Sequence, residues 1–127
     1  MKDFKKYYII PSEPEEVFTA ITNPFTIELW TGYKAIMDSN VDTEFSLLEG
    51  DITGKNLEII DNKKIVQEWY FGDQPEKSIV TINLFDNKKG TQVELIHKNI
   101  PDEDYENIIE GWNEYYFGAL KSFFEIE

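Results

Sequence analysis

His97 is the side chain best suited to proton transfer in this sequence. It is the sole histidine among 127 residues. It follows Val93 and Leu95 at steps of two, which predicts that the three side chains face the same side of a strand. An imidazole there could act as a general base or supply a polar contact at the mouth of a cavity. A lone histidine at a strand end can equally be a structural hydrogen-bonding group, and the sequence favours this second interpretation.

Acidic side chains do not form a recognisable catalytic pair with His97. The carboxylates at 102–104 fall at the start of a predicted helix, where the helix dipole stabilises negative charge. Alternation places Glu68 and Glu94 on the solvent side of their strands. One histidine and no cysteine cannot make a typical zinc site, so we expect no metal and no cofactor. Phosphate-loop and nucleophile-elbow motifs are also missing from the sequence, which favours binding without turnover but leaves an enzymatic role open.

Aromatic side chains are the stronger candidates for a binding site. Each tryptophan has a large apolar surface and an indole N–H that needs a partner, a combination common in cores and in pocket walls. For Trp112 core packing is favoured, because Gly111 beside it would let the helix approach a sheet closely. The predicted cavity-lining residues are Trp30, Phe45, Trp69, Phe71, Ile82, Leu95, His97, Trp112, Tyr115 and Tyr116.

The charge of the chain argues against several classes of partner. Its 25 acidic and 12 basic residues give a net charge of −13, and every basic residue is lysine. Without guanidinium groups and with a field that repels polyanions, we expect neither nucleic-acid binding nor stable membrane association. Cysteine, an N-terminal signal-peptide pattern and long apolar runs are all missing from the sequence, which predicts a cytoplasmic protein.

Local signals predict one domain, 1–127, that begins with a strand and two short helices. Residues 4–10 are aromatic and aliphatic without a helical period, as expected of a strand. Ser12 and Glu15 have the spacing of a capping box, and Asn23 precedes a proline, which is a second helix-start signal.

Beyond the second helix the pattern changes to strands. Apolar residues alternate with polar ones, for example Val80, Ile82 and Leu84, which predicts an antiparallel sheet covered on one face. Residues 87–90 predict a hairpin with glycine where a positive φ is needed. The final run, Tyr105–Phe124, predicts an aromatic helix with one broad apolar face. An α+β arrangement follows, in which a curved sheet of about six to seven strands receives this long C-terminal helix.

Three groups of residues give the chain a resemblance to a known family. They are Asn23, Pro24, Leu29 and Trp30; Gly54–Leu57, Ile59, Ile65, Val66 and Trp69; and Glu94, Leu95, His97, Gly111, Trp112 and Leu120. In this order and spacing they resemble the C-terminal domain of the activators of the ninety-kilodalton heat-shock chaperone ATPase, within the START-like (SRPBCC) superfamily. The resemblance covers nearly the whole chain.

The resemblance implies a helix-grip fold, in which the sheet clasps the final helix around a deep, mostly apolar cavity. Members of the superfamily bind lipids, sterols, polyketides or plant hormones, and some polyketide-handling relatives catalyse cyclisation. The fold does not choose among these functions. Because the predicted inward positions are rich in aromatic residues and no catalytic couple is present, we expect a non-catalytic domain that binds a small hydrophobic or aromatic molecule in this cavity. Two alternatives stay open: a regulator of a heat-shock chaperone ATPase, and a cyclase-like enzyme with His97 or a buried acid as base. We expect the chaperone as a partner only after the small molecule. Eukaryotic activators rely largely on an extra N-terminal domain, and this sequence begins at the first strand.

Overall fold

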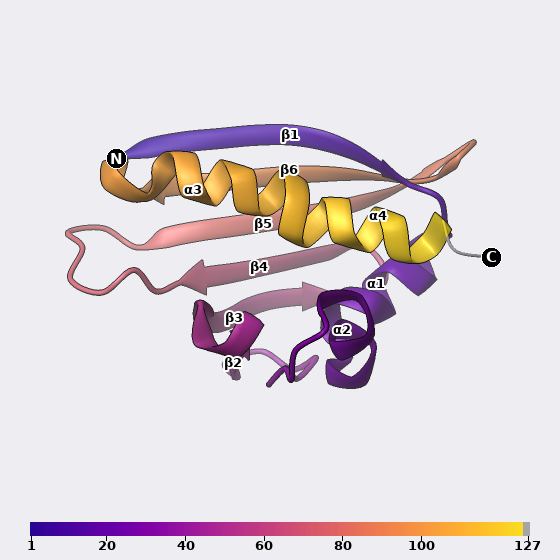
Figure 1. Cartoon of the computed structure of the whole chain (residues 1–127), viewed down its shortest axis with the longest axis horizontal. Coiled ribbons are helices and arrows are strands. Elements are labelled where there is room, and N and C mark those ends of the chain that lie inside the picture. The colour runs from indigo at the N-terminus through magenta and orange to yellow at the C-terminus, as the bar shows by residue number, and fades with distance from the viewer. Residues whose placement is uncertain (126–127) are drawn as a thin grey trace.

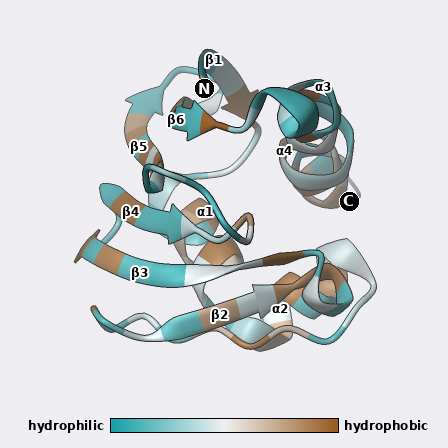
Figure 2. Cartoon of the chain, turned by 90° about the vertical axis from the view of Figure 1, so that its left-hand side faces the viewer, coloured by the Kyte–Doolittle hydropathy of each residue, from teal (hydrophilic) through white to brown (hydrophobic). Residues whose placement is uncertain are grey.

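A six-stranded antiparallel sheet carries a long helix across one face in the computed structural model, which describes residues 1–125 (Figure 1). The strand order is β1-β6-β5-β4-β3-β2. The strands are β1 (Lys2–Ile10), β2 (Glu44–Leu47), β3 (Ile52–Ile60), β4 (Lys64–Trp69), β5 (Ser78–Asn87) and β6 (Gly90–Ile100). Figure 2 shows the sheet curling so that the C-terminal helix lies on its concave side. The predicted α+β fold is confirmed, with six strands.

Alternation along the strands sorts side chains between the two faces. Phe45 and Leu47 on β2 are buried, as are Val80, Ile82 and Leu84 on β5. The strands in Figure 2 accordingly show alternating hydrophobic and hydrophilic bands. This is the outcome that a period of two predicts for a sheet with one covered face.

The hairpin between β5 and β6 forms as predicted, whereas the segment after α2 forms less strand than expected. Asn87 pairs with Gly90, and Gly90 has φ +130°, a conformation that glycine adopts without a Cβ clash. Ile36 contributes one isolated bridge to Ser46 rather than a full strand.

Two short helices follow β1, namely α1 (Pro14–Thr22) and α2 (Pro24–Thr31). Asn23 caps α2 as predicted, because its side-chain oxygen accepts a hydrogen bond from the Thr26 amide at 3.1 Å. The prediction of a capping box that starts at Ser12 was wrong. Pro14 occupies the first turn, so Glu13 is the N-cap residue of α1, and the Ser12 hydroxyl instead donates to the Glu16 carboxylate.

The C-terminal helix contains a widened turn. It consists of α3 (Tyr105–Glu110), a π-helical stretch, Gly111–Tyr116, which we call the π segment, and α4 (Phe117–Glu125). Gly118 accommodates this turn, since a Cβ there would lie only 2.2 Å from the Asn113 carbonyl oxygen. Among the described residues, no helix is both long and apolar enough to cross a bilayer.

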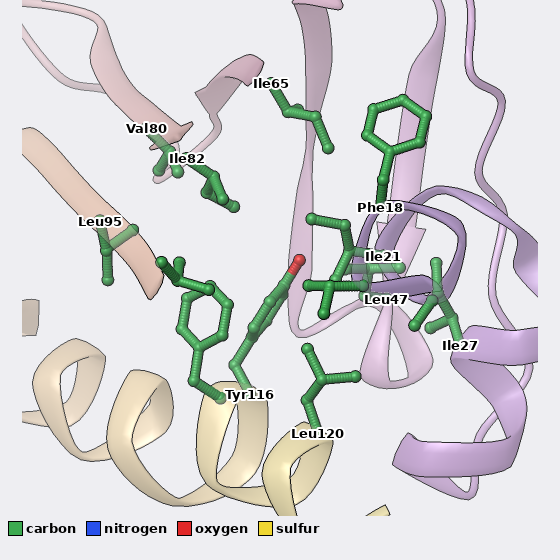
Figure 3. Close-up of a cluster of buried hydrophobic side chains, with 14 of the residues drawn as sticks. Phe18, Ile21, Ile27, Leu47, Ile65, Val80, Ile82, Leu95, Tyr116 and Leu120 are labelled. Atoms are coloured by element: carbon green, nitrogen blue, oxygen red, sulfur yellow. The ribbon is translucent and has the colours of Figure 1, made fainter. Parts of the chain in front are cut away.

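The core lies between the helix and the concave face of the sheet, and α1 and α2 close one end of it. Figure 3 shows side chains from every layer meeting there, including Ile21 of α1, Ile27 of α2 and Leu120 of α4. Burial of these apolar side chains is the main force that holds the helix on the sheet.

Candidate functional site

His97 sits at the centre of a sealed hydrogen-bond cluster. The Trp112 indole N–H donates to His97 Nδ1 at 3.0 Å, and His97 Nε2 lies 2.8 Å from Ser78 Oγ. Because Nδ1 accepts, the ring proton must be on Nε2, which donates to Ser78. The Ser78 hydroxyl donates in turn to the Lys98 carbonyl at 3.2 Å. Every polar atom of this cluster therefore has a partner.

Burial makes His97 a neutral side chain. Loss of solvation lowers the pKa of His97 to about 3, because the charged imidazolium is disfavoured in the protein interior. Its Nδ1 lone pair is already engaged by Trp112. The arrangement can fix the Trp112 ring, but it leaves no free lone pair for a general base.

Trp69 is held by a second buried polar chain. Its indole N–H donates to Gln67 Oε1 at 3.0 Å, and the Gln67 amide donates to Asn56 Oδ1, also at 3.0 Å. Asn56 then donates to the Asp38 carbonyl at 3.0 Å and to Thr43 Oγ1 at 3.1 Å. The chain ties the loop before β2 to the tryptophan of β4.

Asn56 and Ser78 belong to these buried clusters but were not predicted as site residues. The signal that could have found them is a polar residue at an inward-facing position of a strand, which needs a buried partner. Gln67 shares the inner face of β4 with Ile65 and Trp69, and its pairing with Asn56 depends on the register between β3 and β4.

Two clefts open between the C-terminal helix and the turn that joins β2 to β3. The inner cleft also touches the start of β3 and the end of β4, and the outer cleft also touches the end of α2. The inner cleft measures about 370 Å³ and the outer cleft about 500 Å³. Leu48, Asp51 and Tyr115 border both clefts. The inner cleft is lined by Leu48, Asp51, Ile52, Trp69, Asn107, Ile108, Gly111, Trp112, Tyr115 and Tyr116. The outer cleft is lined by Trp30, Thr31, Tyr33, Leu48, Glu49, Asp51, Tyr115 and Ala119.

A larger hollow of about 1000 Å³ lies elsewhere, around the β3–β4 and β5–β6 turns. Polar and charged residues such as Asn62, Lys63 and Lys88 form much of its wall. The inner cleft has the aromatic walls that small apolar ligands require, so it is the better candidate for a ligand site.

The ten predicted cavity residues do not line one common space. Trp69, Trp112, Tyr115 and Tyr116 line the inner cleft, and Trp30 lines the outer one. Four others, Phe45, Ile82, Leu95 and His97, are buried in the interior of the domain. Phe71 lies just beyond the end of β4 and is partly buried, with its ring centroid 6.1 Å from that of His97.

The π segment decides which aromatic side chains face inward. Trp112 and Tyr116 are buried, whereas Tyr115 is 58% exposed and stands at the rim of the clefts. Gly111 does not serve the close approach to the sheet that we expected, because nothing lies within 4 Å of a Cβ built on it. It borders the inner cleft instead.

Comparison with known proteins gives consistent matches over nearly the whole chain. The model of the family described as "Activator of Hsp90 ATPase homolog 1-like protein" matches residues 11–125. The human "Activator of 90 kDa heat shock protein ATPase homolog 1" is 29% identical over 115 residues, which are 89% of this chain and 34% of the relative. The chain thus spans about a third of the length of that curated relative.

Solved structures match over nearly the whole chain. An HSP90 activator from Plasmodium falciparum is 28% identical with a TM-score of 0.85, and the match covers 94% of both chains. A protein from Mesorhizobium loti is 22% identical with a TM-score of 0.82, covering 98% of this chain and 97% of the other. At that identity the second match bears on the fold alone.

Proposed function

The chain belongs to the family of Activator of Hsp90 ATPase homolog 1-like proteins, and from this premise we propose that it is a non-catalytic protein whose inner cleft binds a small, planar, apolar molecule. The family and the START-like fold agree with the resemblance drawn from the sequence. The observation that carries the proposal is the pair of indole rings, Trp69 and Trp112, which stack at 4.7 Å and form a wall of this cleft.

The dimensions and rigidity of the inner cleft support this role. Its volume of about 370 Å³ falls in the range typical of small-molecule sites. Trp69 is fixed by Gln67, and Trp112 by His97, so both rings are held in place before any ligand arrives. A preorganised wall lowers the entropy cost of binding.

The chemistry of the cleft supports binding rather than turnover. Asp51 is its one carboxylate, and neither histidine nor lysine lines it among the described residues. His97 stands behind Trp112 with both ring nitrogens engaged. General acid–base catalysis needs a group that can exchange a proton with the ligand, and the walls of the cleft offer no acid–base pair.

NMR titration tests the proposal, with flavone and 2-ethylnaphthalene as small planar probes and cholesterol as a large one. The expected result is a saturable shift of the Trp69 and Trp112 indole N–H resonances with the planar probes. Gly111→Leu should abolish these shifts, because the new side chain projects into open space at the cleft. Glu114→Leu is the matched control, since it adds the same side chain at an exposed position that borders neither cleft.

Two results would overturn the ligand proposal. One is an absence of saturable shifts with every probe on the unmodified protein. The other is unchanged affinity in Gly111→Leu, which would place the probes outside the inner cleft.

A second candidate function, regulation of a heat-shock chaperone ATPase, is favoured by one specific match. The Plasmodium falciparum protein described as an HSP90 activator is covered over 94% of its length by this chain. Contact with a chaperone would need exposed apolar side chains, and α2 offers Phe25 and Leu29, which are 76% and 70% exposed.

ATPase measurements on an HSP90-type chaperone, with and without this protein at low and moderate salt, test the second candidate. We expect a changed rate that Phe25→Ser and Leu29→Ser reduce, while Val41→Ser, an exposed apolar site outside α2, does not. An unchanged rate at both salt concentrations would remove the candidate.

A further inference from the structure

We propose that the Tyr116 hydroxyl selects the ligand of the inner cleft by donating a hydrogen bond to an acceptor on a neutral planar molecule. This inference rests on the proposed ligand-binding function and adds the chemical class of the ligand. The class is an apolar ring system that carries a carbonyl-type oxygen and no negative charge.

Tyr116 is held rigidly by its aromatic neighbours. Its ring centroid lies 5.1 Å from that of Trp30, 4.7 Å from that of Trp112 and 4.8 Å from that of Phe117. Figure 3 shows the ring leaving the helix towards the strands, with the hydroxyl at its far end. The position of the hydroxyl is therefore fixed, as a specificity group requires.

The hydroxyl of Tyr116 lacks the hydrogen-bond partner that buried polar groups normally have. The side chain is only 4% exposed, yet its oxygen bonds to none of residues 1–125. Within the same residues, no side-chain oxygen or nitrogen that is fully sealed from solvent is without a partner. The Tyr116 oxygen must therefore touch accessible space, and Tyr116 is a wall of the inner cleft.

Other buried aromatic donors in this region are satisfied. The indole N–H of Trp30 donates to the Ala20 carbonyl at 2.7 Å, and those of Trp69 and Trp112 donate to Gln67 and His97. The protein supplies no partner for the Tyr116 hydroxyl, so an acceptor on the ligand would take the place of water at this donor.

The protonation state of Tyr116 makes it a donor. Burial raises the pKa of Tyr116 far above its ordinary value, because the phenolate is disfavoured away from solvent. The group is thus a neutral phenol at physiological pH, and it can donate to a carbonyl oxygen.

Charge around the clefts excludes anionic ligands. Asp51 borders both clefts, Glu49 borders the outer one, and no lysine lines either of them within the described part of the chain. The whole chain carries a net charge of −13. A carboxylate or phosphate would meet repulsion here without a cationic partner.

Three matched probes separate these requirements. They are 2-acetylnaphthalene, which has the acceptor; 2-ethylnaphthalene, which has nearly the same shape without it; and 2-naphthoate, which is an anion. Dissociation constants come from the Trp69 and Trp112 indole resonances. We expect 2-acetylnaphthalene to bind about five- to tenfold more tightly than 2-ethylnaphthalene, as one net hydrogen bond gives, and 2-naphthoate to bind weakest.

Tyr116→Phe removes the hydroxyl and keeps the ring. It should therefore give 2-acetylnaphthalene and 2-ethylnaphthalene the same dissociation constant, while the affinity for 2-ethylnaphthalene stays unchanged. Tyr7→Phe is the matched control, because it removes an exposed hydroxyl on β1 that bonds to Glu94. Urea unfolding should find Tyr116→Phe as stable as the unmodified protein, since its hydroxyl makes no bond to the described residues.

The outcomes distinguish this inference from the proposed function. If neither neutral probe binds, the ligand-binding function itself fails. If both bind equally and Tyr116→Phe changes nothing, the cleft binds ligands and the role of Tyr116 is wrong. Tight binding of 2-naphthoate would overturn the exclusion of anions.

Discussion

The two sides of Trp112 show how one helix can serve stability and binding in neighbouring regions. Towards β6, His97, Ser78 and Trp112 form a cluster in which every polar atom is paired. Towards the turn between β2 and β3, the inner cleft is bordered by Gly111, which faces open space, and by Tyr116, whose hydroxyl bonds to none of residues 1–125. Paired polar groups thus hold the Trp112 ring on one side, and a residue with an unpaired hydroxyl lines the cleft on the other.

Replacing Trp112, which bonds to His97 and also lines the inner cleft, should have the largest effect on stability. Trp112→Ala should lower the free energy of unfolding by about 3–5 kcal/mol, because it deletes a fully buried ring and leaves the buried His97 Nδ1 unpaired. Urea unfolding followed by far-UV circular dichroism measures this. Tyr115→Ala, at the exposed rim, should cost about 1 kcal/mol or less. A cost below about 1 kcal/mol for Trp112→Ala would mean that the ring is lightly packed on both sides.

The widened turn that separates the two regions should depend on Gly118. Gly118→Ala places a methyl group 2.2 Å from the Asn113 carbonyl oxygen, so the π segment must shift. We expect a loss of about 1–3 kcal/mol in thermal or urea unfolding, as overpacked sites show. Stability equal to that of the unmodified protein would show that the turn relaxes without strain.

Acid should destabilise the buried cluster of His97, Ser78 and Trp112. The folded-state pKa of His97, about 3, lies below the ordinary value of 6.5. The stability that depends on a neutral His97 is therefore complete above pH 6.5 and is lost as pH falls towards 3. Between pH 7 and pH 5.5 the unfolding free energy should drop by about 1 kcal/mol on this account. His97→Gln cannot titrate in this range and should show a flatter profile. Equal slopes for the two proteins would contradict a neutral, sealed His97.

The smallest expected effect is that of Gly111→Ala, which should raise the free energy of unfolding instead of lowering it. Gly111→Ala adds a methyl group that meets nothing within 4 Å, and Gly111 already has helical φ and ψ of −59° and −46°. We expect a gain of about 0.5–1 kcal/mol in unfolding free energy, because alanine loses less backbone entropy in a helix. A loss of stability in Gly111→Ala would mean that the added methyl group meets other atoms, and that the inner cleft is narrow at Gly111.

The sequence predicted the fold well because its patterns are local. Period-two alternation on β5 and the aromatic run Tyr105–Phe124 each carry their own signal within a few residues. Ser12 failed as a cap because Pro14 competes for the same helix start, and both signals are present in the sequence.

The candidate site was less predictable because its geometry depends on contacts between distant segments. The pairing of Val80 with His97 brings Ser78 within reach of the imidazole, and that register is set by the whole β5–β6 hairpin. The π segment moves Tyr115 to the rim and Tyr116 inward, whereas regular helical spacing had put both on one apolar face. Local periodicity cannot indicate one widened turn.

The position of β1 at the edge of the sheet has a consequence for how the protein is made. Its neighbour is β6, with Lys2 opposite Ile100 and Ile10 opposite Thr91. A ribosome adds about 5–20 residues per second, so the first strand emerges roughly 5–20 seconds before the strand that pairs with it. During that interval its backbone groups have no native partner, so β1 stays unpaired for longer than the other strands, each of which has a partner that is its neighbour in sequence.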